Sequence, residues 1–324
     1  MKKLLVILLT IVMMLSIFSL GVLGAEDNTK VGVLLPGNIN DSGWNASVYE
    51  GLMTAEEKYD IKVNYMESVA QSDFEEAFRN FAVMDYDLII GHGYQFQKPA
   101  KKVAESYPET SFAILNGSTS MEPNLASYQF TNWQPGYLSG VLAGLITEND
   151  YIGAIGGQEI PVISDALEAF KDGVHRVNPE AKVVITYVDT WSDVAKGKET
   201  ASAMIENGAD VVVTNANAVG LGSIEACKEA GVYAIGFVND QHEVAPDTVV
   251  ASGIQSNQKL ILRVIEDYLN DEFSAGIYNL GIAEGVEGLS PFYNWEDKLP
   301  KEVINKVNEV EQKIIDGEIT WSAE

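Results

Sequence analysis

The chain has little positive charge and little cysteine or histidine. Its 324 residues include 21 Lys and Arg, 3 His and 1 Cys, against 47 Asp and Glu, and the net charge is −26. A chain this acidic has no broad basic face to replace the counterions of a phosphate backbone, so we predict no nucleic-acid partner. A lone cysteine forms no internal disulfide, and with three scattered histidines it predicts no metal site. We expect Cys227, inside a predicted helix, to be a buried and unreactive thiol.

The sequence motifs of common enzymes are missing too. There is no phosphate-binding P-loop, no G-x-S-x-G nucleophile elbow, and no pair of histidines at metal-ligand spacing. The stretch Gly220–Glu225 begins like a dinucleotide-binding turn but has Glu225 where the last glycine belongs. Asp41, Asp193 and Asp240 are candidate acid–base groups, but no nucleophile or metal ligand accompanies them. We therefore predict that the protein is not an enzyme and has no catalytic residues and no cofactor.

The first 24 residues have the pattern of a signal peptide. Lys2 and Lys3 precede the apolar run Leu4–Leu20, and residues 22–24 fit a small-residue cleavage site. We predict that residues 1–24 are removed and that the protein is exported, to the periplasm or the cell surface. Ala25 stands where a lipoprotein has its lipobox cysteine, so we expect no lipid anchor. The alternative is an uncleaved membrane anchor, since about 20 apolar residues can span a bilayer.

Beyond residue 30, short apolar runs alternate with amphipathic segments. The runs are β-branched and nearly continuous, as expected for parallel strands covered by helices on both faces. The predicted strands are Val31–Leu35, Leu88–Ile90, Phe112–Leu115, Tyr151–Ile155, Val183–Val188, Asp210–Thr214 and Tyr233–Phe237. The predicted helices are Ala46–Tyr59, Phe74–Met84, Pro99–Tyr107, Gly136–Ile146, Ile163–Val177, Ala195–Asn207, Leu221–Ala230, Leu260–Leu269 and Lys301–Ile315. This alternation predicts an α/β fold of two similar halves, the second beginning near Tyr151.

Ligands of open α/β sheets bind beyond the carboxyl ends of the strands, and here those ends are rich in aromatic, amide and carboxylate side chains. The predicted binding residues in these loops are Asp41, Trp44, Asn45, Tyr94, Asn116, Trp191, Asn215, Asn217 and Asp240. Aromatic faces stack on flat rings or sugars, while amides and carboxylates bind polar edges and hydroxyls. The alternative is a structural role, in which Asp41 or Asn45 caps the following helix and Trp44 packs over the core.

Arginine is the scarcest charged residue and is absent from these loops. The three arginines, Arg79, Arg176 and Arg263, all fall within predicted helices. A site for a carboxylate or phosphate usually uses guanidinium groups, although backbone N–H groups at helix starts can replace them. The sequence therefore favours a neutral ligand.

A series of short motifs runs through the chain in a fixed order. They are Asp41–Asn45 followed by Tyr49–Gly51, Gly91–Tyr94, Gln134–Ala143, Ile152–Gly157, Thr190–Asp193, Gly208–Val211 and Asp316–Ile319. Together they resemble the basic membrane protein, or purine nucleoside receptor-like, family of ABC-transporter substrate-binding proteins. The resemblance implies a type I periplasmic-binding-protein fold, in which two Rossmann-like lobes with parallel sheets are joined by a three-strand hinge and enclose a ligand cleft. It implies an N-terminal lobe of residues 25–131 and about 250–275, and a C-terminal lobe of residues 132–249 and about 276–324.

Taken position by position, the resemblance places six of these residues against the ligand, namely Asp41, Trp44, Asn45, Tyr94, Asn116 and Asp240. Two positions depart from the nucleoside-binding members. Val238 stands where they usually have an acidic residue, and Gln255 where they tend to carry lysine. Both look like ribose contacts, so the resemblance supports purine stacking better than ribose recognition. Trp44 in place of the commoner phenylalanine resembles a subgroup that takes a bare base such as adenine.

We therefore expect an extracytoplasmic, monomeric solute-binding protein that carries a neutral purine nucleobase or nucleoside to an ABC permease in the membrane. Trp44, Tyr94 and Trp191 would stack on the ring, the asparagines and aspartates would bind its polar edge, and Gln255 would lie near the hinge. Three alternatives remain. They are a carrier of a sugar or another small neutral solute, a ligand sensor for a membrane receptor, and an enzyme that splits a nucleoside.

Overall fold

Two six-stranded sheets organise the chain. The protein is described by a computed structural model that covers residues 28–40 and 44–322. The first sheet contains β1 (Thr29–Leu34), β2 (Ile61–Met66), β3 (Leu88–His92), β4 (Ser111–Leu115), β5 (Leu125–Phe130) and β11 (Gly276–Leu280). The second contains β6 (Tyr151–Gly156), β7 (Lys182–Tyr187), β8 (Val211–Asn215), β9 (Tyr233–Val238), β10 (Val249–Gln255) and β12 (Glu287–Leu289).

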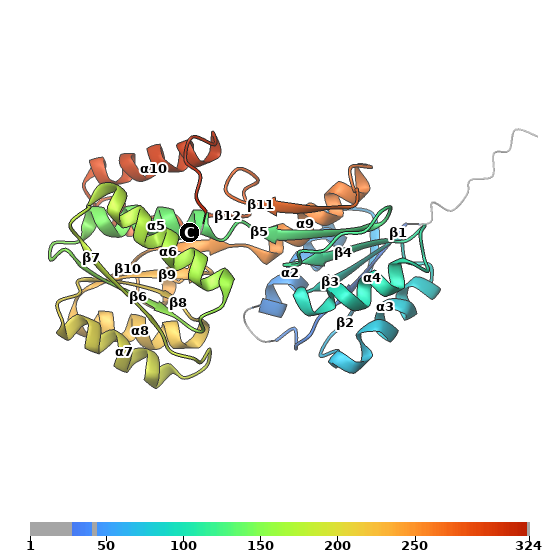
Figure 1. The fold of residues 1–324 in the computed structure, drawn as a ribbon, viewed down its shortest axis with the longest axis horizontal. Helices are drawn as coiled ribbons and strands as arrows, with labels where there is room; N and C mark the ends of the chain where they lie inside the picture. The colour runs from blue at the N-terminus through green and yellow to red at the C-terminus, as the bar shows by residue number, and fades with distance from the viewer. Residues whose placement is uncertain (1–27, 41–43, 323–324) are drawn as a thin grey trace, which may run out of the picture.

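The two sheets repeat one strand order. The first runs β11-β5-β4-β3-β1-β2 and the second β12-β10-β9-β8-β6-β7, and of the paired strands β10 and β12 alone are antiparallel. The helices are α2 (Trp44–Lys58), α3 (Phe74–Val83), α4 (Gln97–Ala104), α5 (Trp133–Ile146), α6 (Pro161–Val177), α7 (Val194–Glu206), α8 (Asn217–Ala230), α9 (Asn257–Leu269) and α10 (Lys301–Ile315). Figure 1 shows the sheets in two lobes that lie side by side, each sheet between layers of helices. The prediction of an α/β fold with two parallel-stranded lobes is confirmed.

The chain passes between the lobes three times, at residues 131–132, at residue 256 and across residues 281–286. The second crossing lies about six residues after the expected boundary near 250, and the third begins about six residues after the expected boundary near 275. The correction has a simple physical reason, because β10 completes the second sheet and β11 completes the first before the chain leaves each lobe. Between them α9 packs on α2, where a β-carbon on Gly51 would lie 2.5 Å from the Ile261 side chain.

The predicted strands and helices are all present, with strand ends within two residues of their predicted positions. The edge strand β2 was missed, as were β5 and the last three strands. In β2, buried or half-buried residues alternate with more exposed ones, a pattern that a search for continuous apolar runs does not detect. The prediction for Cys227 is confirmed, because the thiol is fully buried and burial raises its pKa to about 12.

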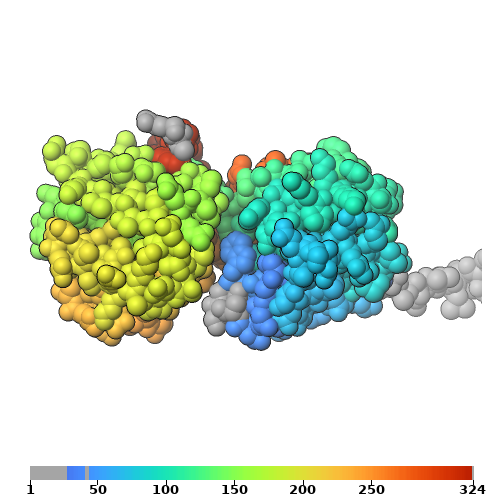
Figure 2. All heavy atoms as spheres, turned by 60° about the horizontal axis from the view of Figure 1, so that its bottom comes forward, coloured from blue at the N-terminus to red at the C-terminus, as the bar shows by residue number. Residues whose placement is uncertain are grey.

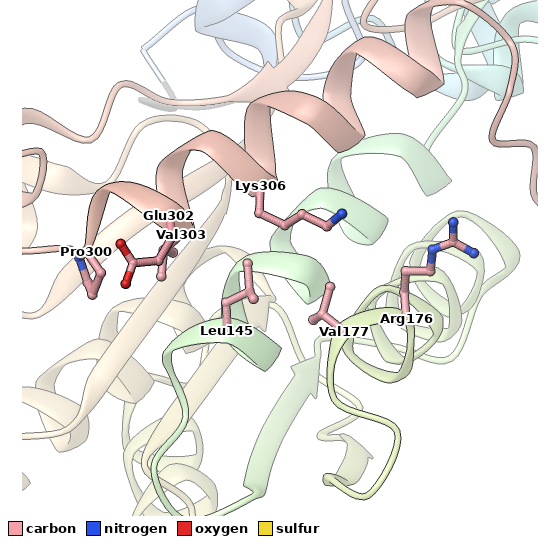
Figure 3. A pocket seen from close by; sticks show the side chains of 7 residues that line it. All are labelled: Leu145, Arg176, Val177, Pro300, Glu302, Val303 and Lys306. Atoms are coloured by element: carbon pink, nitrogen blue, oxygen red, sulfur yellow. The ribbon is translucent and has the colours of Figure 1, made fainter.

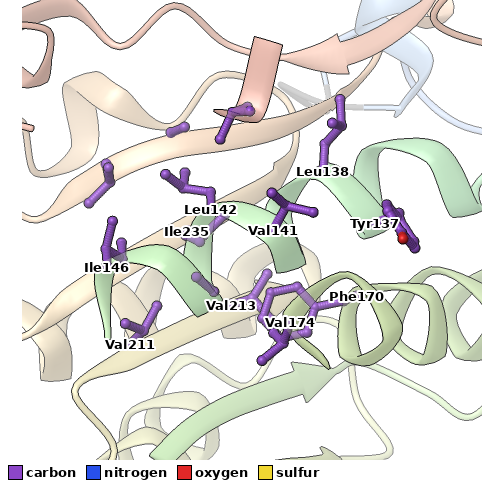
Figure 4. Packing of buried hydrophobic residues seen from close by; sticks show 14 of the residues in the cluster. Tyr137, Leu138, Val141, Leu142, Ile146, Phe170, Val174, Val211, Val213 and Ile235 are labelled. Carbon is purple, nitrogen blue, oxygen red and sulfur yellow. The ribbon is translucent and has the colours of Figure 1, made fainter. Parts of the chain in front are cut away.

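One of the two core clusters of the second lobe lies between α5, α6 and the strands β8 and β9, and the other lies on the opposite face of the sheet, under α7 and α8. Figure 4 shows Val141 and Leu142 of α5 near Phe170 of α6 and near Val213 and Ile235 of the sheet. All are buried, and α5 itself is buried along most of its length. The helix that begins at the first crossing is therefore fixed inside its lobe.

Glycines let α5 and α6 approach each other backbone to backbone. A β-carbon on Gly140 would lie 1.9 Å from the carbonyl oxygen of Phe170, and one on Gly136 would lie 2.1 Å from that of Ala166. A β-carbon on Gly173 of α6 would likewise lie 2.1 Å from the carbonyl oxygen of Tyr137. These distances are far below van der Waals contact, so no larger residue fits unless the helices separate.

We predict that Gly140→Ala lowers the free energy of unfolding by about 1–3 kcal/mol, because the added methyl group must push the two helices apart. Urea denaturation at constant pH measures this change. The control is Ser139→Ala in the same helix, which adds no volume and removes a buried hydroxyl that has no hydrogen-bond partner among the described residues. That variant should match or exceed the wild-type stability. An unchanged midpoint for Gly140→Ala would contradict the close-packing argument.

Candidate functional site: the cleft between the lobes

Each sheet has one point at which its strand order reverses. In the first sheet β1 lies between β2 and β3, and in the second β6 lies between β7 and β8. The connections on either side of such a point leave in opposite directions and open a crevice at the carboxyl ends of the strands. The predicted binding residues in the described part of the chain lie at these ends or at those of the adjacent strands β4, β9 and β10.

The crevice of the first lobe presents the ring of Trp44. Its indole stacks on the imidazole of His92, with centroids 4.4 Å apart and planes at 27°. His92 Nε2 also lies 3.2 Å from the Trp44 carbonyl oxygen, and the His92 side chain is fully buried at the end of β3. Trp44 remains 39% exposed, so it does not simply pack over the core. The arrangement fixes one face of the indole and leaves part of the ring open.

Two amides of the first lobe are bonded within the protein. The buried Asn45 accepts a hydrogen bond from the Gly37 N–H at 3.3 Å. Asn116 donates to the Asn257 side chain at 3.1 Å, which ties the end of β4 to the start of α9. Tyr94, in contrast, is 72% exposed at the end of β3. Asp41 lies outside the described residues.

The matching crevice of the second lobe is built around Trp191. Its indole covers Gly157, where a β-carbon would lie 2.3 Å from the ring. The Gly157 N–H donates to the Asn215 carbonyl oxygen at 3.1 Å, and the Trp191 carbonyl oxygen accepts from the Ala218 N–H at 3.0 Å. Asn215 is buried, whereas Asn217 is exposed at the start of α8. Trp191 and the backbone of Asn215 thus both contact Gly157 at the end of β6.

A cavity of about 510 Å³ lies between the lobes, among α2, the start of α9 and the ends of β9 and β10. Its lining residues are Ala46, Ser47, Glu50, Val238, Asn239, Asp240, Ile254, Ser256 and Gln258. Of the predicted binding residues in the described part of the chain, Asp240 is the one that lines this cavity. The charged lining residues are Glu50 and Asp240, both acidic. Such a wall repels anions.

Residues with a left-handed backbone mark several strand ends in this region. Asn116 and Asn217 have φ angles of 57° and 46°, which asparagine tolerates. Val238 has a φ of 73°, a conformation that is rare for a β-branched residue and costs about 1–3 kcal/mol. Strain of this kind persists where the surroundings impose it, often at binding sites. Val238 lines the inter-lobe cavity, so the strained backbone lies at the wall of that cavity.

A polar network at the hinge joins Asn132 of the first crossing to Gln255 and Glu287, which lie next to the second and third crossings. Glu287 Oε1 accepts hydrogen bonds from the Asn132 backbone N–H and from Gln255 Nε2, both at 3.0 Å. Gln255 Nε2 also lies 2.9 Å from the Asn132 side-chain oxygen. The structure therefore places Gln255 within the hinge itself.

The carboxyl group of Glu287 is buried at the hinge. Its side chain is 5% exposed, and burial raises its pKa to about 8. Gln255 and backbone N–H groups oppose that shift, but Oε2 has no hydrogen-bond partner among the described residues. A buried carboxyl without full hydrogen bonding favours its neutral form.

A second hollow, of about 670 Å³, lies away from the cleft. It is bounded by the ends of α5 and α6 and the start of α10, and Figure 3 shows Arg176 and Lys306 at its edge. No predicted binding residue lines it.

The other two arginines pair with carboxylates on their own helices, Arg79 with Glu75 and Arg263 with Asp267. The prediction that the arginines lie within helices is confirmed.

Sequence reasoning missed several residues that support the cleft. The stacking of His92 under Trp44 was not predicted. Asn132 and Glu287 were not considered, because a single polar residue beside apolar neighbours gives no sign of its distant partner. Tyr293, whose hydroxyl bonds Asp240, was missed for the same reason.

The family model for ABC transporter substrate-binding proteins, PnrA-like (Bmp), matches residues 28–324. The chain belongs to this family. It is 29% identical over 286 residues to a putative ABC transporter glucose-binding protein of Haloferax volcanii, covering 88% of this chain and 72% of that protein. It is 28% identical to basic membrane protein A of Borreliella burgdorferi, covering 98% and 94% of the two chains.

Solved structures show the same architecture. A solute-binding protein of an ABC transporter system from Aeropyrum pernix K1 superposes with a TM-score of 0.77 at 26% identity, covering 91% of this chain and 94% of that one. The fold is that of type I periplasmic binding proteins, as the sequence resemblance implied. Figure 2 shows the narrowing between the two lobes that such a fold produces. Within residues 28–40 and 44–322, no helix is long and apolar enough to cross a membrane.

We predict that Glu287→Gln changes how stability depends on pH. In the wild type the pKa of this group rises from 4.5 to about 8 on folding, so its contribution to stability is full below about pH 4.5 and is lost as pH rises toward 8. The amide does not titrate, so the variant should gain roughly 2–5 kcal/mol relative to the wild type between pH 4.5 and 8.5. Urea denaturation at several pH values measures the difference. The control is Glu302→Gln, which changes an exposed carboxyl group of α10. If the difference in unfolding free energy between Glu287→Gln and the wild type stays constant with pH, the raised pKa of Glu287 is contradicted.

Proposed function

We propose that the protein is an exported, monomeric solute-binding component of an ABC importer that carries a neutral purine-type ligand, either a nucleobase such as adenine or a nucleoside. The observation that carries the proposal is the Trp44 indole, fixed on buried His92 at the reversal point of the first sheet. A planar ring system stacks well on such a surface. The acidic cavity wall beside it argues against phosphorylated ligands.

The ligand would lie between aromatic surfaces from both lobes. Trp44 and Tyr94 would contact it from the first lobe and Trp191 from the second. The polar edge of the ring would be bound by strand-end amides and carboxylates, namely Asp41, Asn45, Asn116, Asn215, Asn217 and Asp240. No catalytic group is part of this arrangement, so the ligand is released unchanged to the permease.

Binding between two hinged lobes selects the arrangement in which both contact the ligand. The network of Asn132, Gln255 and Glu287 lies where the three crossings meet, so it is the point about which the lobes would close. Docking of the closed form on the permease would then deliver the ligand.

A sugar is the second candidate ligand. Stacking aromatic rings with nearby amides also bind sugars, and the Haloferax volcanii relative is named as a glucose-binding protein. The departures at Val238 and Gln255 leave ribose recognition without two of the residues found in nucleoside binders.

Isothermal titration with adenine, adenosine, guanosine, riboflavin, D-glucose and D-ribose tests the proposal. We predict that at least one purine binds and that Trp44→Ala weakens its binding about tenfold to a hundredfold, because stacking on a base contributes about 1–3 kcal/mol. Trp44→Phe keeps an aromatic face and should retain most of the affinity. Binding of a sugar with no response to any purine would reject the purine assignment and support the sugar carrier.

A further inference from the structure

A short segment that follows the third crossing reaches back to the predicted binding residue Asp240. This segment begins with the 3-10 turn Tyr293–Trp295, just after β12. The Tyr293 hydroxyl donates to Asp240 Oδ2 at 2.6 Å, a contact between residues 53 positions apart. A hydrogen bond of this length to a carboxylate is among the stronger side-chain interactions.

Both oxygens of the Asp240 carboxylate are held. Oδ1 accepts the His242 backbone N–H at 3.0 Å, while Oδ2 accepts the Tyr293 hydroxyl. The Tyr293 ring stacks on the His242 ring, with centroids 4.4 Å apart and planes at 28°. An ionised carboxylate has about four acceptor positions, so about two remain for a ligand in the cavity that Asp240 lines.

Tyr293 is itself fixed by its neighbours. It has a left-handed backbone, with a φ of 50°, and its side chain is 47% exposed, so burial does not hold it in place. The residues that follow it are anchored to the loop after Asp240. Trp295 Nε1 donates to the Pro246 carbonyl oxygen at 3.0 Å, and Lys298 pairs with Asp247 at 2.7 Å.

We propose that Tyr293 is a positioning residue, which holds the Asp240 carboxylate toward the inter-lobe cavity and so sets ligand affinity. It touches Asp240 rather than the ligand. The inference rests on the proposed function, in which Asp240 binds the polar edge of the ligand. The affinity of the Asp240 carboxylate for the ligand then depends on the segment that follows the third crossing and contains Tyr293.

The test is a double-mutant cycle of Tyr293→Phe and Asp240→Asn, with adenosine as the titrated ligand. Tyr293→Phe removes the hydroxyl but keeps the ring on His242, so we predict a Kd increase of about fivefold to tenfold with little change in unfolding free energy. In the Asp240→Asn background the same change should have no further effect, because Tyr293 acts through the carboxylate. The control is Asn294→Ala, which removes contacts with Pro246 and Asp247 and leaves Asp240 untouched. Its Kd should stay within about twofold of the wild type.

The outcomes separate the two proposals. If Asp240→Asn weakens adenosine but Tyr293→Phe does not, or if the two effects add, the positioning role is overturned and the binding site stands. If Asp240→Asn has no effect on a bound purine, the proposed role of Asp240 fails, and the inference with it. If adenosine does not bind but adenine does, the same cycle is run with adenine. If no purine of the titration series binds, the purine assignment fails, and the cycle is run with D-glucose.

A measurement without ligand tests the contact itself. The hydrogen bond to Asp240 raises the pKa of the Tyr293 phenol above 10. Titration of ¹³C-labelled tyrosine by NMR, with Tyr293→Phe to assign the signal, should show that Asp240→Asn moves this pKa back toward 10. An unchanged pKa would overturn the contact whatever the ligand is.

Discussion

The hinge depends on one buried carboxyl group, that of Glu287. It accepts hydrogen bonds from the Asn132 backbone and the Gln255 side chain, so the three crossings meet at one point instead of acting as separate linkers. That point determines how the carboxyl ends of the two sheets lie relative to each other. The inter-lobe cavity follows from the same geometry, because β10 and α9 both contribute to its wall, and β10 ends at the second crossing while α9 begins directly after it.

Most of the fold could be predicted from the sequence, because buried parallel strands give continuous apolar runs. Val211–Asn215 is buried at every position and was predicted within one residue. The edge strand Ile61–Met66 was missed because its burial alternates, and β12 because three residues carry no periodicity. The positions of the crossings could not be predicted without knowing which sheet each strand joins. Gly276–Leu280 joins the first sheet by pairing with β5, about 150 residues earlier in the chain, and no local pattern encodes that pairing.

The position of the candidate site was predictable for the same reason as the strands, since a strand end fixes where its loop lies. Trp44 and Asn45 could be placed at the first sheet, and Trp191 and Asn215 at the second, without knowing any contact. The contacts were not predictable. Trp44 lies on His92, Gln255 bonds Glu287 and Asp240 bonds Tyr293, and in each pair the partner is at least 32 residues away. Such contacts arise from packing, which a single sequence does not display.

The discontinuity of the first lobe has a consequence for the order of folding. Its sheet needs β11 and its helix α2 needs α9, yet both lie beyond the strands β6 to β10 of the second lobe. A chain that emerges from its N-terminus therefore exposes the outer edge of β5 and the apolar face of α2 until residues 257–280 have followed. The second lobe has five of its six strands by residue 255. The lobe that comes first in the sequence is thus completed late, and its uncovered surface is where premature association between chains would begin.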